Sequence, residues 1–261
     1  MQLDNVKIHG DSGPPVLLLP GGAESCDGFF PGIVEGLVTD PGCRVIVHDR
    51  PGTGTSSEPG RLADATAHLH ALINELGLGP VVVVGQSLGG AVALLLADDH
   101  PESVAGLVLI DPTPINDPRS CARIERLTST LASLGKLPVL RSLVAATFRA
   151  AVARSTRNRT LRPDCAAVFE RTAHLDIAQL GHAVHGLADL SAALDESTLP
   201  VVPAILITAD RKPAAPVAQA HARLAVALNA TIESWPTADH NAHLTHPDET
   251  LATIRSLITN L

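Results

Sequence analysis

The sequence predicts an α/β protein with a doubly wound, mostly parallel sheet and an inserted helical lid. Short runs of Val, Ile and Leu recur along the chain, as in strands that are buried on both faces. Segments with helical spacing of apolar residues separate most of these runs. Residues 115–196 break the alternation, because they carry helix-like segments and no strand signal. A parallel sheet interrupted by one long helical insertion accounts for all three observations.

The expected elements follow one another in chain order. The first residues offer at most a short edge hairpin. Buried strands are expected at residues 16–19, 44–49, 80–84, 107–111, 204–208 and 231–235. Helices are expected at residues 62–76, 91–97, 217–228 and 247–261. Pro112 and Pro114 end the strand that leads into the insertion.

This order divides the chain into a core and a lid. Residues 1–112 and 197–261 are expected to form the core, and residues 113–196 the lid, placed over the carboxyl ends of the strands. Apolar side chains of the lid are expected to cover a pocket: Leu127, Leu131, Leu134, Leu137, Leu140, Leu143, Val144 and Phe148.

Composition limits the class of protein. The chain has 261 residues, of which 45% are hydrophobic and 18% charged, so a sizeable core is available. Four Phe, one Trp, no Tyr and a net charge of −8 argue against a nucleic-acid partner. No apolar run approaches the ~20 residues of a membrane span, and no secretory signal is visible. Cys26, Cys43, Cys121 and Cys165 form no Cys-x-x-Cys motif, which favours reduced thiols in a cytoplasmic protein.

The insertion has an uneven charge. Residues 113–171 contain eleven Lys and Arg against four Asp and Glu, so they carry +7 and the rest of the chain −15. One interpretation is a solvated helical face that pairs with the acidic core. The other is attraction of an anionic or acyl-carrier substrate.

The most informative motif is Gly-Gln-Ser-Leu-Gly at residues 85–89. It lies between the β-branched run at residues 80–84 and a strong helix former at residues 91–97. A Gly-x-Ser-x-Gly between a strand and a helix is a nucleophile elbow, which exposes the serine hydroxyl above the sheet. The N-terminus of the following helix directs free N–H groups toward negative charge that forms there. Ser87 is therefore the candidate nucleophile.

A serine at an elbow needs a base, and His240 is the candidate. His240 lies between the last short strand and the final helix, on the edge where loops after the strands collect. With these motifs, the chain resembles an α/β-hydrolase over nearly its whole length. The segments that carry the resemblance are residues 18–22, 49–56, 85–90 and 239–248, in the order in which the family has them.

The resemblance implies a role for each motif. Ser87 would be the nucleophile and His240 the general base that returns the proton to the leaving group. The backbone N–H groups of Leu88 and Gly22 would form the oxyanion hole. Pro20 stands where the family usually has histidine. Because the hole uses backbone donors, this departure does not by itself remove the activity.

The acid of the triad has two candidates. The family usually places it a few residues after the strand that follows the lid, but there Lys212 holds the matching position and Asp210 lies two residues early. Some relatives instead use the end of the strand after the elbow helix, which here is Asp111. We favour Asp111 over Asp210, and a dyad without an acid is the third alternative.

Two other patterns are given ordinary structural interpretations. His240, His243 and His246 recur every three residues, but Pro247 interrupts any helix and the spacing is not His-x-x-x-His, so no metal site is expected. The turn at residues 52–54 lacks the Gly-Lys-Ser/Thr ending of a phosphate loop. No cofactor is expected.

The expected reaction is hydrolysis of a carboxylic ester, lactone or thioester through an acyl-enzyme on Ser87. Small aliphatic residues suggest a pocket for a compact or flexible apolar acyl group. A serine at the elbow argues against haloalkane dehalogenase and epoxide hydrolase chemistry. Alternatives remain: acyl transfer or carbon–carbon bond hydrolysis by the same triad, a lyase or cofactor-free oxygenase, and a non-catalytic binding protein on this fold.

Overall fold

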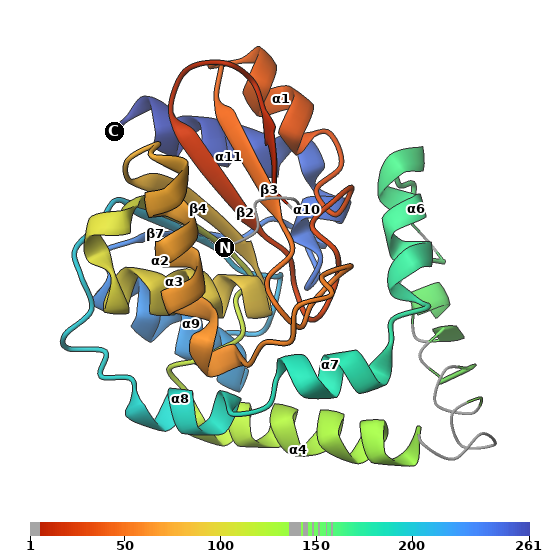
Figure 1. Ribbon diagram of the computed structural model, residues 1–261. Helices are drawn as coiled ribbons and strands as arrows, with labels where there is room; N and C mark the ends of the chain where they lie inside the picture. The colour runs from red at the N-terminus through yellow and green to blue at the C-terminus, as the bar shows by residue number, and fades with distance from the viewer. Residues whose placement is uncertain are drawn as a thin grey trace.

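Seven strands form one mostly parallel sheet at the centre of the protein (Figure 1). The computed structural model describes residues 6–135, 142, 146–147, 149–150, 152–154, 156–157 and 159–261. The strands are β1 (Val6–His9), β2 (Pro15–Leu19), β3 (Arg44–His48), β4 (Val81–Gln86), β5 (Val104–Ile110), β6 (Ala204–Ile207) and β7 (Thr231–Glu233). Their spatial order is β1-β3-β2-β4-β5-β6-β7, and only β1 runs antiparallel to its neighbour.

Strand β1 is an edge strand, but it does not form a hairpin with the strand that follows it. It pairs with β3, with Val6 opposite His48 and His9 opposite Val45. Strand β2 lies between β3 and β4, so both of its edges are already hydrogen-bonded. Strand β1 therefore pairs with the free edge of β3, and the chain then passes to β2 on the other side of β3.

Helices cover both faces of the sheet, as alternation of buried side chains along the strands requires. Leu17 and Leu19 face a layer that contains α2 (Ala65–Leu76), α3 (Leu88–Asp99) and α9 (Pro216–Ala227). Val16 and Leu18 face the opposite layer, which contains α1 (Ile33–Thr39), α10 (Ala242–Thr245) and α11 (Pro247–Thr259). Aliphatic side chains fill the first layer, as the scarcity of aromatic residues predicts, whereas Phe29, Phe30 and Phe169 join them in the second layer.

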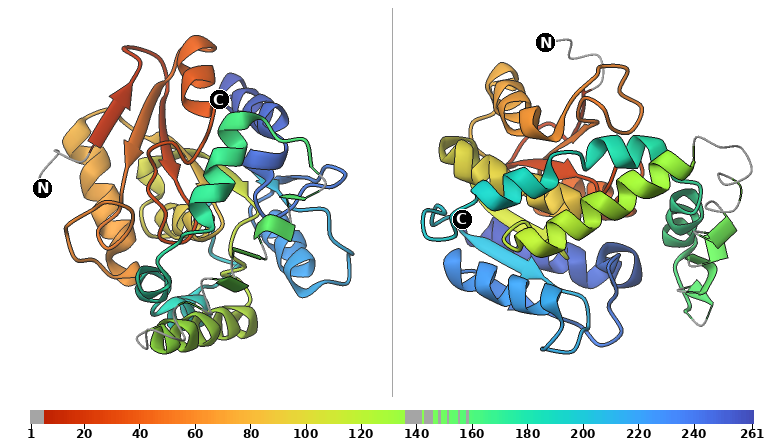
Figure 2. Two further views of the ribbon diagram at one scale, coloured as in Figure 1. Left: turned by 90° about the vertical axis from the view of Figure 1, so that its right-hand side faces the viewer. Right: turned by 90° about the horizontal axis from the view of Figure 1, so that it is seen from below.

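All of the described elements in the segment between β5 and β6 are helices. These are α4 (Pro118–Leu134), α6 (Pro163–Thr172), α7 (Ile177–Ala183) and α8 (Leu187–Ala193). Helix α4 packs against α7 and α8, and the three lie across one edge of the sheet (Figure 2). Helix α6 stands apart from them and packs near α10.

The outer face of α4 differs from the sequence-based expectation. Leu127 is 61% exposed and Leu134 is 39% exposed, so neither side chain covers a pocket. The side chains of α4 that line a cavity are Ile124 and Thr128. Leu131 is partly buried and does not line that cavity. The other apolar residues named above, Leu137, Leu140, Leu143, Val144 and Phe148, lie outside the described residues.

Two further features of the fold are the state of its cysteines and the length of its helices. All four cysteines are buried free thiols. Within the described part of the chain, no helix is both long enough and apolar enough to cross a lipid bilayer.

Candidate active site

Ser87 occupies the sharp turn between β4 and α3. Its backbone has φ 51° and ψ −116°, a conformation that a residue with a side chain rarely adopts. Three hydrogen bonds hold this strained backbone in place. The Ser87 N–H donates to the Ile110 carbonyl at 3.0 Å, and the Ser87 carbonyl accepts from the N–H groups of Ala91 and Thr113 at 3.1 and 2.9 Å. The serine is thereby fixed against the end of β5.

The glycines of the elbow are needed for close backbone packing. A Cβ atom on Gly85 would lie 2.4 Å from the carbonyl oxygen of Gly89. A Cβ atom on Gly89 would lie 2.1 Å from the carbonyl oxygen of Leu19 in β2. Both distances are too short for any side chain, so the turn from strand to helix depends on glycine at both positions.

His240 lies in the loop between β7 and α10 and connects Ser87 to Asp111. Its Nε2 is 2.9 Å from the Ser87 Oγ, and its Nδ1 is 2.6 Å from the Asp111 Oδ2. An ionised carboxylate only accepts hydrogen bonds, so Nδ1 carries the proton and Nε2 is free to accept the seryl proton. The Gln86 side chain donates to the His240 carbonyl at 2.8 Å and holds this loop over the elbow.

Asp111 is buried at the end of β5, with its side chain 1% exposed. Its Oδ1 accepts from the Ala209 N–H at 2.9 Å, and Arg211 donates to both carboxylate oxygens. Burial alone would raise the pKa of Asp111. The hydrogen bonds from Arg211 and His240 outweigh burial and hold the pKa well below its ordinary value. The group beside His240 is therefore a carboxylate throughout the neutral range.

Asp210, the other candidate acid, lies elsewhere. Its carboxylate accepts from the Thr237 N–H at 3.0 Å, and its own N–H donates to the Ala238 carbonyl at 2.8 Å. Asp210 and Lys212 are both exposed. The structure thus brings Ser87, His240 and Asp111 together and places Asp210 in the turn behind them.

A cavity of about 300 Å³ opens beside this group of residues. Gly22, with φ 56°, and Leu88, the first residue of α3, both line it next to Ser87. The N–H of a first helical residue has no acceptor within its helix and is available to a ligand. The remaining lining consists of Asp111, His240, Arg211, Pro112, Thr113, Pro114, Ile124, Thr128, Leu180, Val184, Leu187 and Val217. These residues come from the core and from α4, α7 and α8.

Sequence patterns do not single out Arg211 and His221. Arg211 stands between Asp210 and Lys212, where the family pattern predicts a carboxylate and gives an arginine no role. His221 of α9 is fully buried, with Nδ1 2.8 Å from the Thr208 hydroxyl and Nε2 2.8 Å from the Pro112 carbonyl. Burial lowers the pKa of His221, so the ring is neutral, and its hydrogen bonds hold the turn that follows Asp111 in place. No sequence motif distinguished His221 from other histidines.

The histidines that follow His240 have separate surroundings. His243 is fully buried and stacks on Phe29, with ring centroids 4.8 Å apart. Burial lowers the pKa of His243 to about 3. His246 stacks on Trp235 instead. The three histidines thus project toward different neighbours, which is not an arrangement that chelates one ion.

One group elsewhere, His70, His100 and Glu102, brings potential metal-ligand atoms within 4.8 Å of one another among the described residues. Its geometry does not suit a metal ion. The two imidazole rings are stacked with centroids 4.1 Å apart and an interplanar angle of 11°, so their in-plane lone pairs do not converge. Both ring nitrogens of His70 also have partners, in Ser103 and Asn74.

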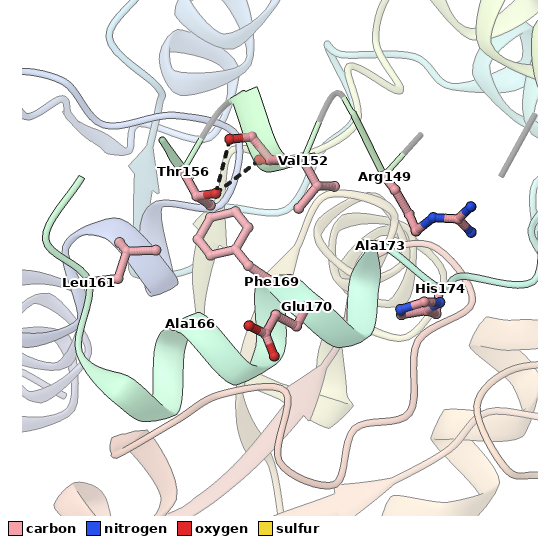
Figure 3. A pocket seen from close by; sticks show the side chains of 10 residues that line it. Arg149, Val152, Thr156, Leu161, Ala166, Phe169, Glu170, Ala173 and His174 are labelled. Carbon is pink, nitrogen blue, oxygen red and sulfur yellow. Dashed lines mark hydrogen bonds between the residues drawn. The ribbon is translucent and has the colours of Figure 1, made fainter. Parts of the chain in front are cut away.

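A second pocket, of about 340 Å³, lies between α6 and the side of the insertion that carries Arg149, Val152, Thr156 and Leu161 (Figure 3). Leu161 and Phe169 belong to its apolar lining, and it shares no lining residue with the cavity beside Ser87. Its one hydroxyl, on Thr156, donates to the carbonyl oxygens of Val152 and Ala153 at 3.2 and 3.4 Å. The described lining therefore offers no activated nucleophile, and the cavity beside Ser87 remains the candidate active site.

A strand–Ser–helix elbow, a histidine and a buried carboxylate on a parallel sheet define a protein of the hydrolase type. A sequence model described as alpha/beta hydrolase fold matches residues 14–247. The chain belongs to this family.

Curated relatives with different names share part of the sequence. Lipase LipV of Mycobacterium tuberculosis is 37% identical over 110 residues, which cover 41% of each chain. A proline iminopeptidase of Lactobacillus helveticus is 34% identical over 103 residues, covering 37% of this chain and 35% of the relative. The chain thus aligns with about two fifths or less of the length of these two relatives.

Solved structures match over nearly the whole chain. The structure of MenH from S. aureus superimposes with a TM-score of 0.79 and covers 98% of both chains, at 15% sequence identity. At this identity the likeness concerns the fold.

Proposed function

We propose that this protein is a serine hydrolase that cleaves a carboxylic ester, lactone or thioester. One observation carries the proposal: an unbroken hydrogen-bonded chain runs from Ser87 through His240 to Asp111, and its serine end faces a cavity. A serine hydroxyl is a weak nucleophile until a base within hydrogen-bond distance takes its proton. The distance of 2.9 Å between His240 Nε2 and Ser87 Oγ meets that requirement.

The proposed reaction has two halves. His240 takes the Ser87 proton as Oγ attacks the acyl carbonyl, and the N–H groups of Leu88 and Gly22 stabilise the oxyanion. Asp111 stabilises the imidazolium, which returns its proton to the leaving alcohol or thiol. Water then attacks the acyl-enzyme with His240 as the base, and the carboxylic acid leaves.

We propose that this cavity binds a substrate whose acyl group is uncharged and compact. Among the described residues that line the cavity, Arg211 is the one Lys or Arg, and its guanidinium already pairs with Asp111. A substrate carboxylate would have to compete with that buried ion pair. Ile124, Leu180 and Val184 instead offer apolar contacts. This argument favours the solvated-face interpretation of the basic insertion over attraction of an anionic substrate.

We also propose that residues 113–196 act as a lid on a core made of residues 1–112 and 197–261. The support is that α4, α7 and α8 contribute side chains to the cavity beside Ser87. The four buried free thiols are in keeping with a reducing compartment such as the cytoplasm.

Peptide bond cleavage, suggested by the iminopeptidase relative, has less support. A site that removes an N-terminal residue has to bind the substrate's ammonium group, which calls for an acidic partner. Among the described lining residues the acid is Asp111, whose oxygens already bind Ala209, Arg211 and His240. Ester-type substrates need no such partner.

The test is turnover of p-nitrophenyl acetate, butyrate and hexanoate by the wild type and by Ser87→Ala. We expect the variant to lose at least about 10³-fold in kcat/KM, while Ser197→Ala, at an exposed turn, keeps wild-type activity. Diethyl p-nitrophenyl phosphate should inactivate the wild type and add one phosphoryl adduct at Ser87, detected by mass spectrometry. Turnover that survives Ser87→Ala, or labelling at another residue, would refute the proposal.

A further inference from the structure

Arg211 occupies the region in which the sequence suggested an acid. It follows β6 in the loop that also contains Asp210 and Lys212, and it reaches back to the end of β5. Both terminal nitrogens of its guanidinium donate to Asp111, one to each carboxylate oxygen. The acid thus comes from one strand end and a cation from the next, in contact with each other.

We propose that Arg211 is a positioning residue that fixes the Asp111 carboxylate and offsets part of the attraction between this carboxylate and the protonated imidazole of His240. This inference rests on the proposed serine hydrolase function. The hydrogen bonds of the Arg211 guanidinium go to Asp111, so Arg211 acts on His240 and Ser87 through that carboxylate.

The fixing role follows from the directions of the hydrogen bonds. The Oδ1 atom accepts from the Ala209 N–H and from Arg211, and the Oδ2 atom accepts from Arg211 and His240. A planar guanidinium that binds both oxygens sets the plane of the carboxylate, because the two donors are parallel. The orientation of Oδ2 toward His240 Nδ1 is therefore defined from the opposite side of Asp111. Without Arg211, one backbone N–H and His240 itself would hold the carboxylate.

The electrostatic role follows from charge. When His240 is protonated, a single carboxylate lies between two cations, the imidazolium and the guanidinium. The positive charge of Arg211 offsets part of the attraction between Asp111 and the protonated imidazole. Arg211 should therefore extend activity to more acidic pH.

The other titratable groups near this cluster are either neutral or paired with another partner. His221 of α9 has its Nδ1 3.9 Å from the Asp111 Oδ1, but burial lowers its pKa. His243 of α10 is buried, with its pKa lowered to about 3. Asp239, next to His240 in the chain, pairs with Arg159 of the insertion at 3.4 Å, and its negative charge also helps to raise the pKa of Arg211, after the hydrogen bond to Asp111. Asp210 binds the Thr237 backbone instead. Arg211 is thus the group whose charge bears directly on Asp111.

The experiment compares the pH dependence of kcat/KM for p-nitrophenyl butyrate in the wild type, Arg211→Met, Arg211→Gln and Arg211→Lys. Arg211→Met and Arg211→Gln should move the acidic limb of the profile upward by about one pH unit, because the offsetting charge is gone. Arg211→Lys keeps the charge but cannot bind both oxygens in one plane. It should leave the limb near its wild-type position and lower kcat about three- to tenfold. Arg61→Met, which removes an exposed arginine paired with Asp64, is the matched control and should change neither quantity.

A readout that needs no turnover separates this inference from the proposed function. The His240 ring can be titrated by NMR in Ser87→Ala and in Ser87→Ala combined with Arg211→Gln. The second protein should titrate about one pH unit higher. If Ser87→Ala itself retains activity, the proposed function fails while this titration still reports on Arg211. An unchanged His240 titration and an unmoved acidic limb in folded Arg211→Gln would overturn the inference.

Discussion

Asp111 and Asp210 provide the sharpest comparison at the scale of single residues, because sequence reasoning treated them as alternatives. Asp111→Asn should lower kcat for p-nitrophenyl butyrate by about 10²–10⁴-fold. An amide NH2 in place of Oδ2 would donate a hydrogen bond to His240 Nδ1. The ring proton would then sit on Nε2, facing Ser87, which is the wrong tautomer for a base. Asp210→Asn is the matched control, since its carboxylate binds the Thr237 N–H, and it should stay within about threefold of the wild type. A large loss in Asp210→Asn and none in Asp111→Asn would reverse the assignment.

The sequence predicted Ser87 and His240 as neighbours because each follows from local patterning. Ser87 stands in a strand–turn–helix motif, and His240 follows the last strand, so both reach the same edge of the sheet. For the acid of the triad, the sequence left two candidate residues, Asp111 and Asp210. Its position depends on how β6 pairs with β5, where the Asp111 N–H donates to the Ile207 carbonyl at 2.6 Å. Single-residue patterns do not encode that register, nor the reach of Arg211 across it.

The elbow helix α3 illustrates what close packing demands of a whole element. Gly89→Ala would place a methyl group 2.1 Å from the Leu19 carbonyl oxygen and force α3 away from β2. We expect a loss of about 3 kcal/mol or more in the free energy of unfolding, measured by urea denaturation. Gly135→Ala is the control: its nearest contact is 3.4 Å, its φ is −64°, and it follows the end of α4. It should change stability by no more than about 1 kcal/mol. Equal effects at the two positions would contradict this packing argument.

Helix α4 presents one face to the cavity and another to solvent, which allows a matched pair of substitutions. Thr128 lines the cavity beside Ser87, and its neighbour Leu127 is 61% exposed. Thr128→Trp should reduce the volume for the acyl chain and lower kcat/KM for the hexanoate ester at least about tenfold more than for the acetate ester. Leu127→Trp should leave the ratio of the two activities unchanged. A ratio unaffected by Thr128→Trp would show that the acyl chain lies elsewhere.

The elements that the sequence missed are short or depend on distant contacts. The seven residues of α1 and the four of α10 are too few for a clear periodic pattern. On α4, the sequence shows three leucines but not which face meets the core, because helices α7 and α8 determine that face. The long strands and amphipathic helices of the core were predictable because burial on both sides of a parallel sheet leaves a strong apolar signal.

At the scale of the whole molecule, the stability of the fold should depend on pH through His243. This side chain is fully buried beside Phe29 and Phe30, and its pKa falls from 6.5 to about 3. Below pH 6.5 the unfolded chain binds a proton at this position, while the folded chain does not until about pH 3. The unfolded state then holds more protons, so stability decreases as the pH falls. The expected slope is about 1.4 kcal/mol per pH unit from this residue alone.

The measurement is urea unfolding of the wild type and His243→Leu between pH 7 and pH 4.5. The leucine keeps an apolar side chain against Phe29 and Phe30 and removes the proton-binding group. The free energy of unfolding of the wild type should fall more steeply, by about 2.7 kcal/mol more over the two units below pH 6.5. His221, whose pKa burial also lowers, contributes equally to both proteins and cancels in the difference. Asp111 loses its stabilising contribution only as the pH falls below about 4, since its pKa is lowered from 3.8. Parallel curves for the two proteins would mean that the folded state accepts a proton at His243, and that the core beside the His240 loop opens to water at mildly acidic pH.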